Sequence, residues 1–185
     1  SSDICSYEFD WNNISYVYAG AQKNLGIPGV TICIFEKGFF SKNDLTSYMD
    51  VHNHIDKNSM FNTPPTFSIY VMLKVLEWID ENGGIKKIEQ NNVLRANKIY
   101  YFLDKNINTL TTLAPVEFRS NSNIVFDFKA ENQTDLFLEK SFENNFIGLN
   151  GHRSVGGVRV SNYNSVTEEM VKDFLLLLDK FISSN

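Results

Sequence analysis

The N-terminal end of this 185-residue chain predicts too few strands for a complete sheet, and this shortage constrains the fold more than any other feature. Residues 15–19 and 30–36 are rich in Val, Ile, Tyr and Phe and predict two short buried strands. A turn-rich loop joins them, and a polar connector without periodicity follows over residues 38–61. Because two strands do not make a stable sheet, we expect this end to be one piece of a larger α/β sheet whose N-terminal part is missing here.

The remainder of the chain predicts helices and a small α+β unit. In chain order, its expected elements are a helix that follows Pro64-Pro65 and ends at Gly83-Gly84, a helix over 85–106, an antiparallel hairpin of 116–118 and 124–128, a helix over 134–146, a strand around Val158 and Val160, and a final helix opened by a capping box at 165–168. We therefore expect an α/β fold with two parts, residues 1–76 and residues 77–185.

Charge and cysteine content exclude several classes of protein. The chain has 17 basic and 22 acidic residues, a net charge of −5 and a pI of about 5.2, so no general positive field attracts nucleic acid. No apolar run is long enough to span a membrane, and we expect a soluble protein. Two cysteines are too few for a disulfide scaffold, and Cys33 in VTICIF predicts a buried, reduced thiol. These features favour a cytoplasmic location.

Lys23 lies in YAGAQKN (18–24), directly after an expected apolar strand. A lysine between small-residue turns and buried strands would be partly desolvated, which favours an unprotonated amine able to attack a carbonyl and form a Schiff base. The alternative is an exposed loop lysine. Local features favour this alternative, because periodicity says nothing about the protonation of an amine.

The segment GHRSVGGVR (151–159) concentrates glycine and arginine near the C-terminus. It holds two of the four arginines in a chain that otherwise prefers lysine. Glycine permits close approach to the backbone, and the planar guanidinium suits carboxylate or phosphate. The pattern is equally compatible with a site for a small anionic substrate and with a glycine-rich turn bearing two surface arginines.

Two polar segments give weaker signals. Asn62-Thr63-Pro64-Pro65, at a predicted helix start, offers a hydroxyl, an amide and backbone N–H groups of the kind that hold phosphate, but alone it is a helix cap. His52 and His54 could suggest a metal site. No further ligands are grouped with them, so we expect surface histidines and no metal.

Together, YAGAQKN (18–24), FNTPPTF (61–67) and GHRSVGGVR (151–159) occur in an order and at spacings that resemble the phosphoserine aminotransferase family. Each segment is weak alone, but the ordered set is highly specific, and the resemblance runs through essentially the whole chain. It corresponds to the C-terminal half of that family of homodimeric pyridoxal-phosphate enzymes with the aspartate-aminotransferase fold (fold type I). It implies that residues 1–76 end the large cofactor-binding domain and that residues 77–185 form the small domain.

The resemblance implies cofactor roles for four residues. Lys23 would form the Schiff base with pyridoxal phosphate, and Gln22 beside it would help to hold the cofactor phosphate. Asn62 and Thr63 match residues that bind the cofactor phosphate from the neighbouring subunit.

Substrate roles follow from the resemblance in the same way. His152 and Arg153 match residues around the substrate's phosphate group, and Arg159 matches the arginine that grips the α-carboxylate. The implied reaction is reversible amino transfer between O-phospho-L-serine and 2-oxoglutarate, giving 3-phosphohydroxypyruvate and L-glutamate in L-serine biosynthesis. The implied partners are these small molecules and a second copy of the chain, without nucleic acid or membrane.

Two alternatives remain open. In the family, the N-terminal half supplies the acid that pairs with the pyridine nitrogen and the aromatic residue stacked on the ring, and residues 1–4 resemble the stretch just after that acid. The chain alone would then be a catalytically incompetent fragment. The second alternative is a related fold-type-I aminotransferase acting on serine, alanine or glyoxylate, which the GHRSVGG match disfavours. One departure from the family pattern is NLGIPG after Lys23, where the proline is moved by one place.

Overall fold

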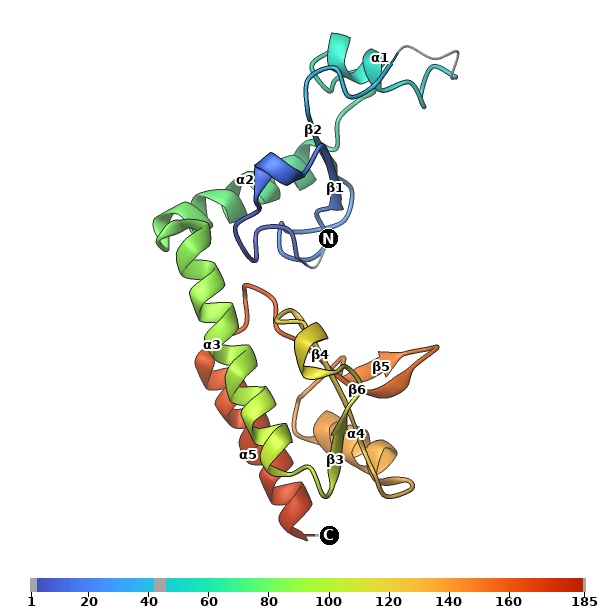
Figure 1. The fold of residues 1–185 in the computed structure, drawn as a ribbon. Helices are drawn as coiled ribbons and strands as arrows, with labels where there is room; N and C mark the ends of the chain where they lie inside the picture. Colours follow the sequence, from blue (N-terminus) through green and yellow to red (C-terminus); the bar gives the residue numbers. More distant parts are fainter. Residues whose placement is uncertain (1–2, 42–45, 185) are drawn as a thin grey trace. The chain divides into compact units, whose positions relative to one another are not determined.

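The computed structural model describes residues 3–41 and 46–184, which fold as two units. We call residues 3–86 the N-terminal unit and residues 87–184 the C-terminal unit, and each is described by itself (Figure 1). The division falls within helix α3 (Gly84–Lys105), whereas the boundary expected from the sequence lies between residues 76 and 77. That boundary refers to the domains of a longer protein and stays a prediction. The expectation for residues 1–4 lies partly outside the described residues.

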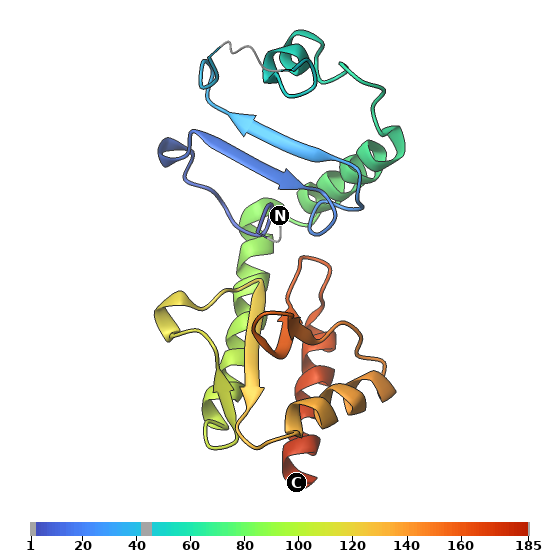
Figure 2. The ribbon, with the colours of Figure 1, turned by 90° about the vertical axis from the view of Figure 1, so that its right-hand side faces the viewer.

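The N-terminal unit contains a two-stranded sheet and two α-helices. Its elements are a 3-10 turn η1 (Trp11–Asn13), β1 (Tyr16–Gly20), β2 (Thr31–Phe35), α1 (Val51–Asp56) and α2 (Thr66–Glu81). The strands pair antiparallel (Figure 2). Tyr18 lies opposite Cys33 in the register of the pair. The two strands and the long helix expected in this part of the chain are thus confirmed.

Both strands of the N-terminal unit are more exposed than their apolar sequences predict. Only Ala19 is buried on β1, and no residue of β2 is buried. The expectation of a buried thiol at Cys33 is wrong, because this residue is exposed. The physical reason is that apolar strands of this kind need a layer on each face, and the described residues supply only a two-stranded sheet.

Helix α1 interrupts the region for which the sequence predicted only a polar connector. Asp50 begins this helix, since its carboxylate accepts a hydrogen bond from the His52 backbone N–H (3.0 Å) and also lies 2.9 Å from His52 Nδ1. The His54 Nε2 donates to the Tyr48 carbonyl (3.0 Å). Both histidines are half-buried residues at the surface, held by these local contacts. Six helical residues are too few to show a hydrophobic period.

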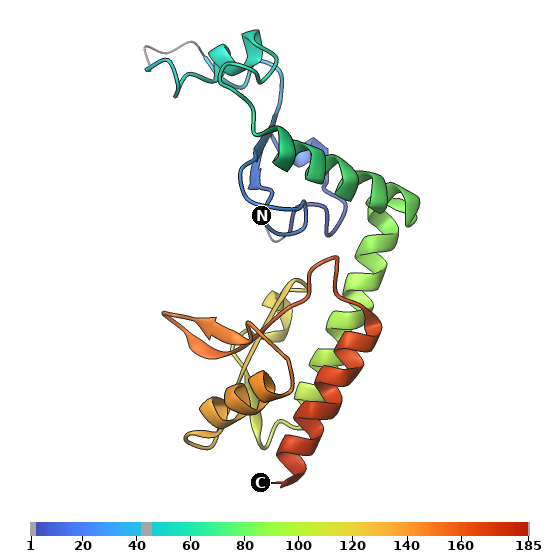
Figure 3. The same cartoon turned by 180° about the vertical axis from the view of Figure 1, so that it is seen from behind.

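The C-terminal unit is a four-stranded antiparallel sheet with helices on one face. Its strands, β3 (Leu110–Thr112), β4 (Asn123–Phe128), β5 (Asn150–His152) and β6 (Gly156–Ser161), lie in the order β3-β4-β6-β5. Helices α3 and α5 (Glu168–Ser184) run side by side, and α4 (Gln133–Glu143) packs with α5 on β4 and β6 (Figures 1 and 3). The helices expected over 85–106 and 134–146 are confirmed. None of the described helices combines the length and apolar character needed to cross a membrane.

Alternation along β4 builds the core of the C-terminal unit. Ile124, Phe126 and Phe128 are buried in one cluster with Val158 of β6, and the helices cover this face. Because successive strand residues face opposite sides, Arg159 lies on the other face of the sheet, where it is paired in register with Val125. The unit therefore presents a second sheet face that no helix of its own covers.

Two expectations for the C-terminal unit are wrong. Residues 116–118 form a 3-10 turn, η2 (Val116–Phe118), and β4 pairs instead with β3, a strand that the sequence analysis missed. Pro115 comes directly before η2 and favours a turn there. The final helix is capped by Thr167 rather than by Ser165, because the Thr167 hydroxyl accepts a hydrogen bond from the Met170 N–H (3.1 Å).

Candidate active site

Lys23 lies on a tight turn that follows β1. The Ala21 N–H donates to the Val30 carbonyl (2.9 Å), and the Lys23 N–H donates to the Ala21 carbonyl (2.7 Å). Ala21 and Leu25 are buried and anchor the turn, whereas Lys23 and Gln22 are exposed. The described residues around Lys23 leave its side chain exposed, in agreement with the loop-lysine alternative that local features favoured. They supply a fixed backbone that presents its side chain.

Glycines allow this turn to pack closely. A Cβ at Gly20 would collide with Gln22 Oε1, so the Gln22 side chain folds back over the end of β1. Gly29 has a φ of +121°, and a Cβ there would lie 2.8 Å from Ser68 Oγ of α2. The Ser68 hydroxyl in turn donates to the Pro28 carbonyl (2.9 Å). The turn and α2 thus form one packed piece, and the displaced proline is part of the contact.

Asn62 and Thr63 lie just before α2 and are exposed. The N-cap of α2 is Pro65, which makes no side-chain capping bond. The interpretation of this segment as a side-chain helix cap is therefore not supported. Neither Asn62 nor Thr63 makes a side-chain hydrogen bond to another residue that the structure describes, so their amide and hydroxyl groups remain accessible to a ligand.

His152 and Arg153 lie at the tip of a tight hairpin between β5 and β6. His152 is paired with Gly156, and the Val155 N–H donates to the His152 carbonyl (2.9 Å). The His152 Nδ1 lies 2.7 Å from the Ser154 Oγ. The sequence analysis expected a turn here but missed β5 and did not single out Ser154. Its position two residues after a histidine in a tight turn is the signal that points to it.

Arg159 extends from β6 on the sheet face opposite the buried Val158. The side chain is half-buried, and its Nε is fully buried without a hydrogen-bond partner among the described residues. A buried donor without an acceptor costs about 1–3 kcal/mol. Arg159 thus has no side-chain hydrogen bond or ion pair in the described structure, and the planar fork of its terminal nitrogens suits a carboxylate.

The other two arginines are engaged within the C-terminal unit. The terminal nitrogens of Arg119 donate to both carboxylate oxygens of Asp104 (2.8 and 2.6 Å), and these hydrogen bonds lower the pKa of Asp104. The Nε of Arg119, like that of Arg159, is buried without a hydrogen-bond partner in the described structure. Arg95 is buried, and its Nε donates to Asn162 Oδ1 (2.9 Å). The two arginines that the sequence selected are therefore the ones without an internal polar partner in the described structure.

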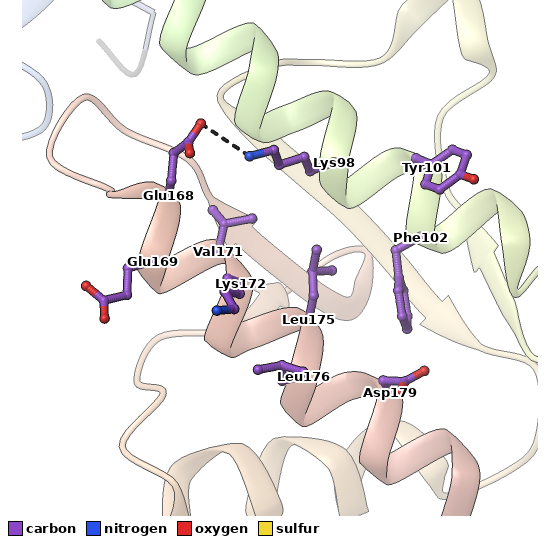
Figure 4. A pocket seen from close by; sticks show the side chains of 10 residues that line it. All are labelled: Lys98, Tyr101, Phe102, Glu168, Glu169, Val171, Lys172, Leu175, Leu176 and Asp179. Carbon is purple, nitrogen blue, oxygen red and sulfur yellow. Dashed lines mark ion pairs between the residues drawn. The ribbon is translucent and has the colours of Figure 1, made fainter.

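A groove of about 780 Å³ runs between α3 and α5 (Figure 4). Phe102, Leu175 and Leu176 contribute to its mostly apolar lining, and the ion pair of Lys98 with Glu168 (3.2 Å) joins the two helices. None of the residues expected at the active site lines this groove.

The expected site residues fall into two sets. Gln22, Lys23, Asn62 and Thr63 belong to the N-terminal unit, and His152, Arg153 and Arg159 belong to the C-terminal unit. Gln22 and Lys23 share the turn after β1, and Asn62 and Thr63 precede α2, whereas His152, Arg153 and Arg159 share the β5–β6 hairpin. Within residues 3–41 and 46–184, no three His, Cys, Asp or Glu side chains gather as a metal ion would require.

The fold and these segments define a class of enzyme. The family model of class-V aminotransferases matches residues 1–174, and the chain belongs to this family. Its relatives include the phosphoserine aminotransferase of Bacillus subtilis, which is 37% identical over 100% of this chain and 52% of the relative. The phosphoserine aminotransferase of Lysinibacillus sphaericus is 41% identical over 95% of this chain and 50% of the relative.

Solved structures give the same result. The phosphoserine aminotransferase of Bacillus circulans subsp. alkalophilus has a TM-score of 0.96 at 39% identity and covers 100% of this chain with 52% of its own. The pyridoxal-phosphate-bound phosphoserine aminotransferase of Trichomonas vaginalis has a TM-score of 0.89 at 30% identity, over 97% of this chain and 52% of its own. The alanine–glyoxylate aminotransferase of Nostoc, at 17% identity and a TM-score of 0.68, shows the fold alone.

These comparisons confirm the resemblance to phosphoserine aminotransferases and the fold-type-I α/β fold that it implied. The chain spans about half the length of the curated relatives that it matches. The roles of the individual site residues stay predictions.

Proposed function

We propose that the whole protein to which this chain belongs is a phosphoserine aminotransferase. It transfers an amino group reversibly between O-phospho-L-serine and 2-oxoglutarate, giving 3-phosphohydroxypyruvate and L-glutamate. The observation that carries this proposal is the hairpin of β5 and β6, which has His152 and Arg153 at its tip and Arg159 on β6, side chains whose chemistry suits two separate anionic groups. O-phospho-L-serine has two anionic groups, a phosphate and a carboxylate. The similarity to phosphoserine aminotransferases along the whole chain supports this choice.

Pyridoxal phosphate fits the donors of the N-terminal unit. Lys23 offers an amine on a fixed turn, and Gln22, Asn62 and Thr63 offer exposed amide and hydroxyl groups of the kind that bind phosphate. When bound, the cofactor supplies an electron sink for the bonds broken at the substrate α-carbon. The phosphoserine aminotransferase of Trichomonas vaginalis binds this cofactor, which supports the assignment.

Lys23 moves the proton in this scheme. With the cofactor bound, its amine would remove the proton from the substrate α-carbon and return it to the cofactor carbon on the other side of the transferred nitrogen, two bonds away. The tight turn around Ala21 holds the lysine backbone in place, which limits the positions that the amine samples. Replacement of this amine would leave no base at the α-carbon.

The C-terminal unit orients the substrate. Arg159 donates hydrogen bonds to the α-carboxylate through its planar guanidinium, and the carboxylate oxygens are the acceptors that this side chain lacks within the described structure. His152 and Arg153 bind the phosphate, so that a phosphorylated side chain is favoured over serine or alanine. Two fixed anionic contacts leave the α-hydrogen little freedom to turn away from the base.

Assembly completes the site. Asn62 and Thr63 act on the cofactor of a second subunit, so the protein is a homodimer with shared sites, located in the cytoplasm. The isolated 185-residue chain is catalytically incompetent, because groups from the rest of the protein are needed. The exposed aromatic face of β1 and β2 supports this view, since it is suited to contact with further protein.

The test compares two lysines of the N-terminal unit in the full-length protein. Lys23→Ala should abolish transamination of O-phospho-L-serine, because the base is lost, whereas the control Lys37→Ala, at another exposed turn, should retain it. Amino transfer is measured as the glutamate formed from 2-oxoglutarate, with L-serine and L-alanine assayed in parallel as amino donors. Substantial activity of Lys23→Ala would overturn the assignment of the base, and preference for serine or alanine would favour a related aminotransferase.

A further inference from the structure

We propose that Ser154 is a positioning residue for His152. Its backbone keeps the neutral imidazole protonated on Nε2, and its hydroxyl fixes the orientation of the ring, so that Nε2–H is aimed outward as a donor to an anionic group. This inference deepens the proposed function and rests on it for the identity of the anion, a phosphate monoester.

The backbone of Ser154 decides which ring nitrogen carries the proton. Its N–H donates a hydrogen bond to His152 Nδ1 (3.3 Å). A backbone amide is only a donor in this geometry, so Nδ1 must present its lone pair. If Nδ1 carried the proton, two hydrogens would face each other. The remaining proton of a neutral ring is therefore on Nε2.

The hydroxyl of Ser154 restrains the ring. Its Oγ lies 2.7 Å from the same Nδ1, which makes it a second donor to that lone pair. The hairpin backbone is closed by the Val155 N–H bond to the His152 carbonyl (2.9 Å), and Gly151 has no room for a Cβ against Gly156. The serine thus holds an exposed histidine that would otherwise rotate freely about its side-chain bonds.

The three histidines of the chain differ in the nitrogen that their partners leave accessible. His52 directs Nδ1 to the Asp50 carboxylate (2.9 Å), which requires a proton on Nδ1. His54 uses Nε2 as a donor to the Tyr48 carbonyl (3.0 Å). In the described structure, His152 is the histidine whose proton-bearing nitrogen makes no hydrogen bond to the protein, and it is exposed beside Arg153.

A neutral Nε2–H donor has a consequence for recognition. Arg153 supplies positive charge next to the ring, and His152 adds a directed hydrogen bond without having to be protonated itself. The pair therefore binds a phosphate oxygen through one charged and one neutral donor. A substrate without that oxygen leaves the histidine donor unused.

The first readout is the tautomer, which does not depend on activity. Histidine ¹⁵N resonances of the full-length protein are recorded at about pH 8.5, well above the ordinary histidine pKa of about 6.5, and His152→Asn assigns the signal. We expect His152 to be protonated on Nε2, and His52, where resolved, on Nδ1. A His152 signal with the proton on Nδ1, or with averaged tautomers, would overturn the proposal.

The second readout is kinetic. Ser154→Ala keeps the backbone N–H and removes the hydroxyl, so the KM for O-phospho-L-serine should rise about two- to tenfold, the range for one neutral hydrogen bond. The KM for glutamate should change less, Ser154→Thr should restore the original value, and Ser183→Ala at an exposed end of α5 should have no effect. An unchanged KM in Ser154→Ala, or equal changes for both substrates, would contradict the role of the hydroxyl. A protein with the Nε2–H tautomer but no turnover of O-phospho-L-serine would instead refute the proposed function.

Discussion

The two units of the chain differ in how well they bury their own apolar residues. Thirteen buried hydrophobic residues form one cluster in the C-terminal unit, around Phe126 and Phe137. The corresponding cluster of the N-terminal unit holds four, of which Ala19 and Ala21 are small. Both units have apolar strands, so composition alone does not explain the difference. The C-terminal unit contains both the sheet and the helix layer of its sandwich, whereas the N-terminal unit contains two strands of a sheet with α2 packed against the loop that joins them.

The uncovered apolar surface of the N-terminal unit is concentrated in aromatic rings. Tyr16 stacks on Phe39 (5.6 Å between ring centroids), and Phe39 meets Phe40 edge-on (5.0 Å). Tyr18 is 70% exposed on the same strand as Tyr16. Clustered exposed aromatics of this kind mark a contact surface. The comparison shows that an apolar strand sequence predicts a buried strand even where the described residues of the chain do not cover it.

The largest expected effect is on stability, and it should differ between the two units when a phenylalanine is replaced by alanine in each. Phe126→Ala should lower the free energy of unfolding of the C-terminal unit by about 3–5 kcal/mol, because it opens a cavity in the core. Phe35→Ala, at a half-buried position of β2, should cost about 1 kcal/mol or less. Urea unfolding is followed by far-ultraviolet circular dichroism and by the fluorescence of Trp11 and Trp78, which both lie in the N-terminal unit. Equal losses would show that the two units are packed alike.

A buried polar contact should have the next largest effect. Asn162 is fully buried, accepts a hydrogen bond from Arg95 Nε (2.9 Å) and donates to the Asn121 carbonyl (2.8 Å). Asn162→Ala leaves these groups unsatisfied and should destabilise the C-terminal unit by about 2–3 kcal/mol. The exposed Asn144, which donates to the Lys140 carbonyl, gives the matched control, and Asn144→Ala should cost less than about 0.5 kcal/mol. Comparable shifts of the urea midpoint in both variants would argue against a buried network.

The smallest expected effect is a loss of stability in acid. Hydrogen bonds from Arg119 lower the pKa of Asp104, so the folded state favours its ionised form. This contribution is present above the ordinary aspartate pKa of about 3.9 and is lost as the pH falls through the lowered value. Because Asp104 is half-exposed, we expect at most about 1 kcal/mol. The urea midpoints at about pH 7 and about pH 3 should differ less in Asp104→Asn than in the original chain. An identical difference would show that the Asp104–Arg119 pair does not contribute to the loss of stability in acid.

Local patterns predicted much of the secondary structure. The helices over α2 and α3 follow from apolar spacing and from the glycines between them, and β4 follows from strict alternation. Pairing was harder. The sequence analysis paired residues 116–118 with β4, but β3 holds that place, because both segments are three residues long and neither is long enough to show a strand period.

Some features of the candidate site were predictable from the sequence, and others depended on the tertiary structure. Motif order by itself determined the family resemblance and selected Lys23, His152 and Arg159, because these segments are local in sequence. Only the tertiary structure decided that Arg159 buries an Nε without a partner, since this depends on β6 pairing with β4 and on the face that the pairing assigns. It also placed Ser154 on the Nδ1 of its neighbour and left the strands of the N-terminal unit uncovered. Burial and hydrogen bonding depend on which segments meet across the fold, and no local pattern records that.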